Sequence, residues 1–319
     1  MSGDEGRSGI EITAAPEAST TYYDRPAIKE PVWTWEVPAY FYVGGVAGAA
    51  AVIGAALQLL DDDESEALVR RCRDIAALGG VAGSLLLISD LGRPERFLNM
   101  LRVFKPSSPL NVGSWILALA SSMSVTAALS SRMSGLAKRL GDLAGVGAGF
   151  AGLPLTGYTA VLVSDTVVPI WRESRKSLPM LFVASSTGAA CSVLEAGAFT
   201  EKELKAVRRL GTIAQVAELV ATKAVEKEAG RVERVARPYN EGVSGTLWKA
   251  STSLTVASLA VDTITGSKRG GRVAAALLGT VGSACLRVAV WQAGRASARD
   301  PRATFELQRM QERDRERRQ

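Results

Sequence analysis

Two phenols and one carboxylate stand where apolar segments of this sequence begin, bend or end. Tyr40 heads the first long apolar segment, Asp90 is the only acid of residues 75–91, and Tyr158 follows Pro154 by about one helical turn. Groups of these types at the edge of an apolar segment can hydrogen-bond a small polar molecule and exchange protons with it. Trp35 would add a flat apolar surface beside them.

The residue types that the sequence lacks exclude several kinds of catalytic and metal centre. The sequence has no histidine, which removes the usual haem ligand and both Ser-His-Asp and Cys-His catalytic arrangements. Its three cysteines, Cys72, Cys191 and Cys285, are far apart and form no C-x-x-C pair. We therefore expect no haem and no metal bound by this chain, so a redox role would need metal centres from another subunit.

The charges are bunched, although the average composition resembles that of a soluble protein. The chain has 319 residues, of which 47% are apolar and 22% charged. Four long stretches contain no Asp, Glu, Lys or Arg, namely residues 37–60, 106–131, 143–164 and 177–194. About 20 mainly apolar residues suffice to cross ~30 Å of hydrocarbon. The net charge of +6 is modest and lies partly in the tail at 309–319, so nucleic-acid binding is not expected.

This pattern predicts an all-α polytopic membrane protein of eight transmembrane helices arranged as two four-helix bundles. We expect a segment outside the membrane at 1–37, a first bundle at 38–164, a second at 165–294 and a charged tail at 295–319. With no basic region before a short apolar core, the first helix should act as the targeting signal. Both termini should lie on one side. The expected spans are 38–60, 75–91, 110–130, 143–164, 178–199, 209–225, 244–264 and 273–294.

The last three expected spans carry ionisable residues. A charge at the bilayer centre costs roughly 2.5–3.5 kcal/mol, so such residues usually face a bundle interior or a water-filled cavity. For Lys223 and Lys249, a position near the membrane interface, with the side chain snorkelling to water, is as well supported as a position facing the interior. Other ionisable residues in the expected spans of this half of the chain are Glu195, Glu218, Asp262 and Arg287.

Small residues recur at spacings that favour close helix packing. Gly44 and Gly48 form one G-x-x-x-G pair, and Gly79 and Gly83 form another. Residues 147–152 match the dinucleotide-binding pattern G-x-G-x-x-G, but no strand precedes them, so we interpret them as a packing surface. Pro154 should kink the fourth span.

Two motifs resemble those of the NrfD/polysulfide-reductase membrane-subunit family. The first contains YYDRP at 22–26 and WTWEVP at 33–38, and the second begins with DLGRPERF at 90–97. The resemblance implies a haem-free, multi-pass subunit of the inner (cytoplasmic) membrane. It further implies electron exchange between quinone or quinol (menaquinone or ubiquinone) and a four-cluster iron–sulfur subunit. A molybdenum or tungsten bis-pterin catalytic subunit would complete the complex.

The resemblance also implies which residues form a quinone pocket in the first bundle. Tyr40 and Tyr158 would contact the head group, and Asp90 would exchange protons with it. Trp35, Glu36 and Arg93 complete the predicted pocket. The competing interpretations are ordinary interfacial aromatics, a helix-end ion pair between Asp90 and Arg93, and a capping role for Glu36.

Two other functions remain open at this point. A proton- or ion-coupled transporter would use Glu195, Glu218 and Asp262, although only one clear proline break is present where paired interruptions are expected. A purely structural anchor would bind no quinone. If the resemblance holds, the surface formed by 22–37 and 93–109 should hold the iron–sulfur subunit.

Overall fold

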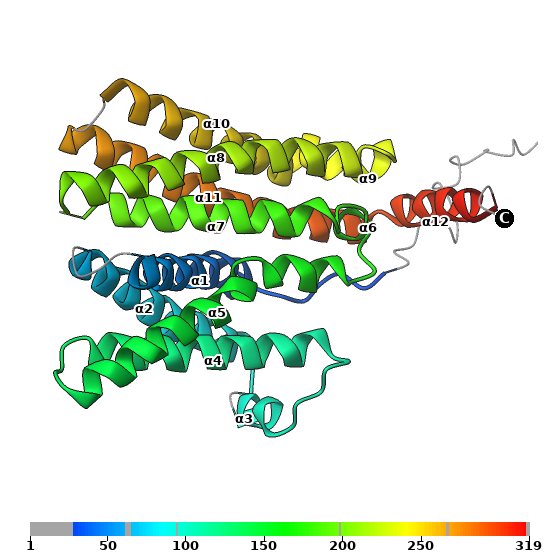
Figure 1. The fold of residues 1–319 in the computed structure, drawn as a ribbon. Coiled ribbons are helices and arrows are strands. Elements are labelled where there is room, and N and C mark those ends of the chain that lie inside the picture. The colour runs from blue at the N-terminus through cyan, green and yellow to red at the C-terminus, as the bar shows by residue number, and fades with distance from the viewer. Residues whose placement is uncertain (1–27, 61–64, 94, 198, 266–267, 317–319) are drawn as a thin grey trace, which may run out of the picture.

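The fold is built of helices lying side by side (Figure 1). The structure, a computed structural model, describes residues 28–60, 65–93, 95–197, 199–265 and 268–316, and no strand occurs among them. Its long helices are α1 (Glu36–Leu60), α2 (Glu66–Asp90), α4 (Pro109–Ser130), α5 (Leu136–Ser164), α7 (Ser177–Glu195), α8 (Glu201–Ala229), α10 (Gly242–Thr265) and α11 (Arg269–Arg299). The shorter helices are α3 (Glu95–Arg102), α6 (Pro169–Glu173), α9 (Glu233–Asn240) and α12 (Pro301–Glu316).

We divide the long helices into two groups by their order in the chain. In the N-terminal helix group, α1 packs on α2 and α5, and α4 packs on α5 and α2. In the C-terminal helix group, α7 packs on α8 and α11, and α10 packs on α11. The two groups meet where α1 and α5 contact α7 and where α1 contacts α11, so α1 is the central helix of the assembly.

Both described ends of the chain lie on one side of the helices. We call this side, where α1 begins, the N-terminal side; α6, α9 and α12 gather there, on the right of Figure 1. Successive long helices cross the assembly in alternate directions, which returns the chain to the N-terminal side after α2, α5, α8 and α11.

Among the described residues, six helices are long and apolar enough by length and composition to cross a membrane, namely α1, α2, α4, α5, α7 and α11. The protein is therefore a multi-pass membrane protein. The other two long helices, α8 and α10, are not among these candidates, and both carry ionisable residues.

Several helices differ from their expected ranges because charges hide helix ends from a hydropathy pattern. α2 begins at Glu66 rather than at 75, and α8 begins at Glu201, where Thr200 and Glu203 form a capping box. α7 ends at Glu195, before the expected 199. The predicted tail at 295–319 is partly helical, because α11 continues to Arg299 and α12 follows. The YYDRP motif at 22–26 lies outside the described residues.

The glycine patterns pack helices against one another. A Cβ at Gly48 in α1 would lie 2.8 Å from the carbonyl oxygen of Gly152 in α5, so the two backbones touch. A Cβ at Gly149 would lie 2.3 Å from that of Ala55, which places 147–152 in a helix–helix contact. α5 contains Pro154 and bends along its length, as expected for an internal proline (Figure 1).

Candidate functional site

Tyr40 is a buried phenol in the first turns of α1. Its side chain is 5% exposed, and its ring lies against α2, where a Cβ at Gly83 would be 3.2 Å from the Tyr40 Cδ2. Glycine at 83 therefore makes room for the ring. Among the residues that the structure describes, none hydrogen-bonds the Tyr40 hydroxyl. The hydroxyl of this buried side chain is not among the fully enclosed unpartnered atoms, so its hydrogen is available to a ligand.

Tyr158 connects α5 to the first turn of α4. The half-buried side chain donates its hydroxyl hydrogen to the carbonyl oxygen of Pro109, and its ring covers Gly113. Tyr40 lies against Gly44 and Gly83 and Tyr158 against Gly113, and among the described residues no hydrogen bond or ring contact joins the two phenols. Because Tyr158 already donates to Pro109, its oxygen is free only to accept a further bond.

Asp90, at the C-terminal end of α2, binds the segment that precedes α1. Its Oδ1 accepts a hydrogen bond from the Thr34 hydroxyl at 2.8 Å and one from the Thr34 backbone N–H at 3.3 Å. The same hydroxyl also contacts the Glu36 carboxylate. Thr34 therefore bridges Asp90 and Glu36, two of the predicted site residues. A hydroxyl has one hydrogen, so Thr34 can donate to only one of the two carboxylates at a time.

The predicted residues thus lie in two layers. Tyr40 touches α2 at Gly83, and Asp90 is about 10 Å further along that helix, at seven residues and 1.5 Å per residue. Tyr40 forms the inner layer and Asp90 and Glu36 the outer one, while Tyr158 lies beside Pro109 and Gly113 at the start of α4. Trp35 is 65% exposed and Arg93 is exposed as well, so neither side chain is packed into these layers.

The sequence pattern missed the segment that crosses the N-terminal side. Trp33 stacks on Trp171 of α6, with ring centroids 5.8 Å apart. Glu30 binds Arg299 at 2.8 Å and Arg295 at 2.5 Å, both in α11. Hydrogen bonds from Arg299 and then Arg295 lower the pKa of the Glu30 carboxyl below its usual value. Arg299 and Arg295 are 269 and 265 positions away from Glu30 in the sequence, so no local pattern pairs them.

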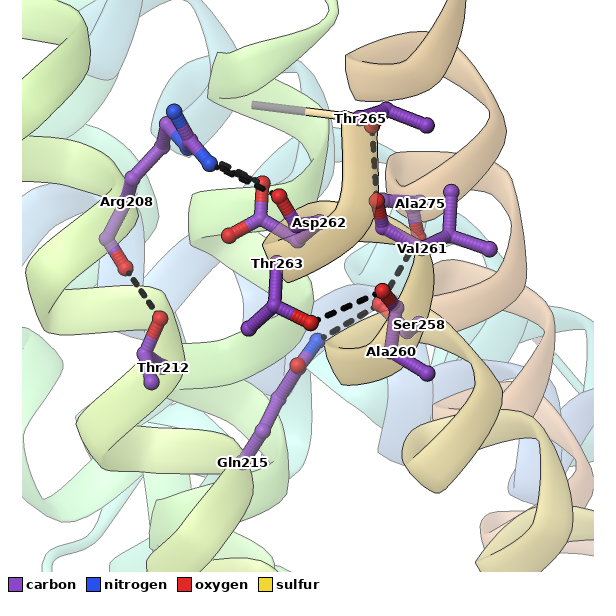
Figure 2. Close-up of polar contacts among 10 residues, drawn as sticks. All are labelled: Arg208, Thr212, Gln215, Ser258, Ala260, Val261, Asp262, Thr263, Thr265 and Ala275. Atoms are coloured by element: carbon purple, nitrogen blue, oxygen red, sulfur yellow. Dashed lines mark hydrogen bonds and ion pairs between the residues drawn. The ribbon is translucent and has the colours of Figure 1, made fainter. Parts of the chain in front are cut away.

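A second set of polar residues fills the C-terminal helix group, where Figure 2 shows part of it. Arg208 of α8 donates to Asp262 of α10 at 2.9 Å, and Gln215 donates to Ser258 at 3.1 Å. Glu195 and Glu218, which sequence analysis placed in spans, are 8% and 4% exposed.

Arg287 of α11 is buried where the two helix groups meet. Its Nη2 donates to Ser186 Oγ at 2.9 Å and to the Phe182 carbonyl at 3.1 Å, and its guanidinium lies 3.9 Å from the Phe182 ring centroid. Ser186 in turn donates to the Thr156 carbonyl of α5 at 3.1 Å. A chain of polar contacts therefore links α11 through α7 to the N-terminal helix group.

The described residues also form an apolar groove and include three cysteines. An apolar groove of about 400 Å³ runs beside the α1–α2 contact and is lined by Val43, Val46, Leu78 and Ala82 among others. No group of three or more His, Cys, Asp and Glu side chains among the described residues could hold a metal ion. Cys72, Cys191 and Cys285 are free thiols.

Comparison with known proteins places this arrangement in a family. The sequence is similar to the C subunit of the polysulfide reductase of Wolinella succinogenes, with 32% identity over 91 residues. This alignment covers 28% of each of the two proteins. The model of the family described as "Polysulphide reductase, NrfD" matches residues 25–295, which include WTWEVP, DLGRPERF and every long helix except the last turn of α11. The protein therefore belongs to the NrfD polysulphide reductase family.

Proposed function

We propose that this protein is a haem-free membrane subunit that exchanges electrons and protons between a quinone and an iron–sulfur partner. The observation that carries the proposal is the hydroxyl of the buried Tyr40 side chain, which has no hydrogen-bond partner among the described residues and lies one layer in from a pair of acids bridged by Thr34. The comparisons support a subunit of an oxidoreductase in general. The quinone and the partner are inferred from the residues and the family.

The proposal includes eight membrane spans, in two four-helix bundles, in the cytoplasmic membrane. α8 lacks an apolar composition because its polar groups face inward. Between Arg209 and Lys223, all of its exposed residues are apolar, and they are Leu210, Ile213, Val216, Ala217 and Val220. A helix that exposes apolar side chains and buries polar ones suits a lipid surrounding. The same holds in part for α10, which buries Ser251, Thr255 and Ser258 and exposes Val256 and Ile264.

The donors present fit a quinone head group. A quinone offers two carbonyl oxygens and takes up two protons when it accepts two electrons. Tyr40 would donate a hydrogen bond to one carbonyl oxygen from its position against Gly83. Tyr158, whose hydroxyl is fixed by its bond to the Pro109 carbonyl, would form another wall of the head-group pocket. The groove along Val43, Val46 and Leu78 has the apolar character that a prenyl tail requires.

Asp90 and Glu36 would hold the exchangeable proton at the mouth of this site. With Thr34 between them, one proton can lie on either carboxylate while the hydroxyl stays bonded to both. Both acids lie at the N-terminal side, where they reach water, and Asp90 is about 10 Å from the level of Tyr40. A water molecule would therefore complete the relay to the head group.

The partner would dock on the N-terminal side. This side exposes large apolar residues outside the helices that cross the membrane, including Val32, Trp35, Val103 and Phe104, which are 56–75% exposed. Trp35 would then serve docking rather than the pocket. Lys29 and Lys105 are exposed beside this surface, and crosslinks from either should reach the iron–sulfur subunit. Crosslinks to lipid alone, with that subunit present, would contradict the docking surface.

The decisive experiment measures quinone turnover by Asp90→Asn in the purified complex. Asparagine keeps the bond from Thr34 but cannot titrate, so the rate with a soluble quinone analogue should fall about 10²–10⁴-fold, the range for a lost acid–base group. Glu66→Gln, an exposed acid at the start of α2 on the opposite side, is the matched control and should leave the rate unchanged. An Asp90→Asn complex that turns over at the wild-type rate from about pH 5 to about pH 9 would show that Asp90 only fixes the N-terminal segment.

A further inference from the structure

The buried face of α8 carries a polar residue at nearly every turn. Arg208, Gln215, Glu218, Thr222 and Glu226 recur at spacings of three, four or seven residues, which places them along one side of the helix. From Arg208 to Glu226 the stripe is about 27 Å long at 1.5 Å per residue. This length is close to the ~30 Å thickness of a bilayer's hydrocarbon core.

Neighbouring helices supply polar partners at each level of this stripe. On the side opposite the N-terminus, Arg208 binds Asp262 at 2.9 Å (Figure 2). Below them, Gln215 donates to Ser258, which donates in turn to the Ala275 carbonyl at 2.8 Å. At the N-terminal side, Trp248 donates to Glu226 at 2.9 Å. Polar groups therefore line the C-terminal helix group from one side to the other.

Glu218 occupies the middle of the stripe and faces polar groups on three helices. Thr255 of α10 donates to its carboxylate at 3.4 Å, Ser185 of α7 is a further hydrogen-bond partner, and Arg287 of α11 interacts with it electrostatically. No direct ion pair joins Glu218 to Arg287 in the part of the chain that the structure describes. The acid therefore keeps a carboxylate oxygen that can take up a proton.

Arg287 supplies an independent sign of water at this level. Its Nε and Nη1 are buried and have no hydrogen-bond partner among the described residues. Buried donors of a charged group are nearly always satisfied, and ordered water is the usual partner when protein groups are absent. Arg272, near Glu195 on the opposite side, has an unpartnered buried Nε as well. Water at these two levels would connect the polar groups of the stripe.

We propose that the C-terminal helix group conducts protons across the membrane along this stripe, with Glu218 as the central carrier. A proton would enter near Glu195 and Asp262, pass the level of Gln215 and bind a carboxylate oxygen of Glu218. An O–H bond of a hydrated proton breaks as the new O–H bond forms. The proton then leaves through water to Glu226 at the N-terminal side. No electron moves, and the path needs no quinone.

The test is proton flux through the full-length chain in phospholipid vesicles that contain a trapped pH-sensitive dye. A potassium gradient with valinomycin supplies the driving voltage. Wild-type protein should acidify the vesicles faster than protein-free vesicles do. Glu218→Gln keeps the shape and should lower the protein-dependent rate about 10²-fold, as for other lost proton-transfer groups. Glu218→Asp should restore part of the flux, and Glu66→Gln should conduct like the wild type.

Any of three results would overturn the proposal. The first is a wild-type flux no faster than that of protein-free vesicles, and the second is a wild-type rate in Glu218→Gln. The third is an equal loss of flux in Glu66→Gln and Glu218→Gln. If Glu218→Gln fails to fold, Glu195→Gln at the entrance provides the same comparison and should also lower the flux. Quinone turnover is measured separately, so the failure of this proposal is distinguishable from that of the quinone site.

Discussion

The two helix groups solve the problem of packing in a membrane in opposite ways. The N-terminal helix group joins backbones through small residues, as at Gly48 and Gly152, and has polar contacts toward each end, with Thr34 and Asp90 at one and Arg73 and Asp142 at the other. The C-terminal helix group buries charged and hydroxyl side chains along its whole length, with Arg287 and Glu218 near the middle. Close contact is sufficient for an anchor, whereas buried charge is costly. The difference indicates that the second group does more than hold the first.

The largest effect should follow from Arg287→Met. The change removes a fully buried cation, its bonds to Ser186 and Phe182 and its electrostatic interaction with Glu218, so the unfolding free energy should fall by about 3–5 kcal/mol. Thermal unfolding in detergent measures this. The double variant Arg287→Met/Glu218→Gln should recover part of the loss, because no unpaired charge remains. Arg132→Met, which removes an exposed partner of Asp74, should cost at most about 1 kcal/mol. Equal losses of unfolding free energy in Arg287→Met and Arg132→Met would contradict the contrast between the two helix groups.

Gly48→Ala tests the packing of the N-terminal helix group. The added Cβ would lie 2.8 Å from a backbone oxygen, and backbone cannot swing away as a side chain can. We expect a loss of about 1–3 kcal/mol in unfolding free energy. Gly270→Ala places the same methyl group in open space in α11 and should be close to neutral. If the two variants unfold at the same temperature, the α1–α5 contact is looser than described.

Tyr158→Phe and Tyr40→Phe separate a structural phenol from a binding phenol. Tyr158 loses its bond to Pro109, so its variant should lose about 0.5–1.5 kcal/mol of stability. Tyr40→Phe should leave stability nearly unchanged and weaken the binding of a quinone analogue. Unfolding temperature and analogue titration on the same samples give both quantities. If Tyr40→Phe lowered stability and Tyr158→Phe weakened the binding of the analogue, the roles of the two phenols would be exchanged.

The smallest effect should come from the pH dependence of the contact that joins the N-terminal segment to α11. The pKa of Glu30 is lowered by Arg299 and Arg295, so its stabilising effect is complete above the ordinary pKa of a glutamate. The effect is lost as the pH falls through the lowered pKa. At neutral pH, Glu30→Gln should cost at most about 1 kcal/mol, and the difference from wild type should vanish in acid. A difference that grows in acid would contradict the sign.

The fold of this protein is easier to predict from its sequence than its sites are, because hydropathy is a local property. Charge-free runs identified α1, α4, α5 and α7 to within a few residues, except at the start of α5 and the end of α7. The start of α2 was missed because Arg73 lies inside the helix, where it binds Asp142 of α5 at 2.9 Å. The family resemblance was confirmed by the match over 25–295.

The site depends on contacts that no spacing reveals. Tyr40, Asp90 and Tyr158 were selected from the sequence, and their roles stay predictions. Thr34, which connects Asp90 to Glu36, carried no signal of its own, because its partner Asp90 is 56 positions away. The carbonyl of Pro109 that holds Tyr158 is a backbone atom and is invisible to residue-type patterns.

The contact between Glu30 and α11 also bears on how the protein is made. Glu30 leaves the ribosome before Arg299, which follows 269 positions later. At about 5–20 residues per second, the early segment waits on the order of tens of seconds for its partner. During that time Trp33 and Glu30 cannot close over the end of α11. The nascent protein therefore completes its N-terminal side only after its last long helix has been inserted, and a protein truncated before Arg295 would leave that side open.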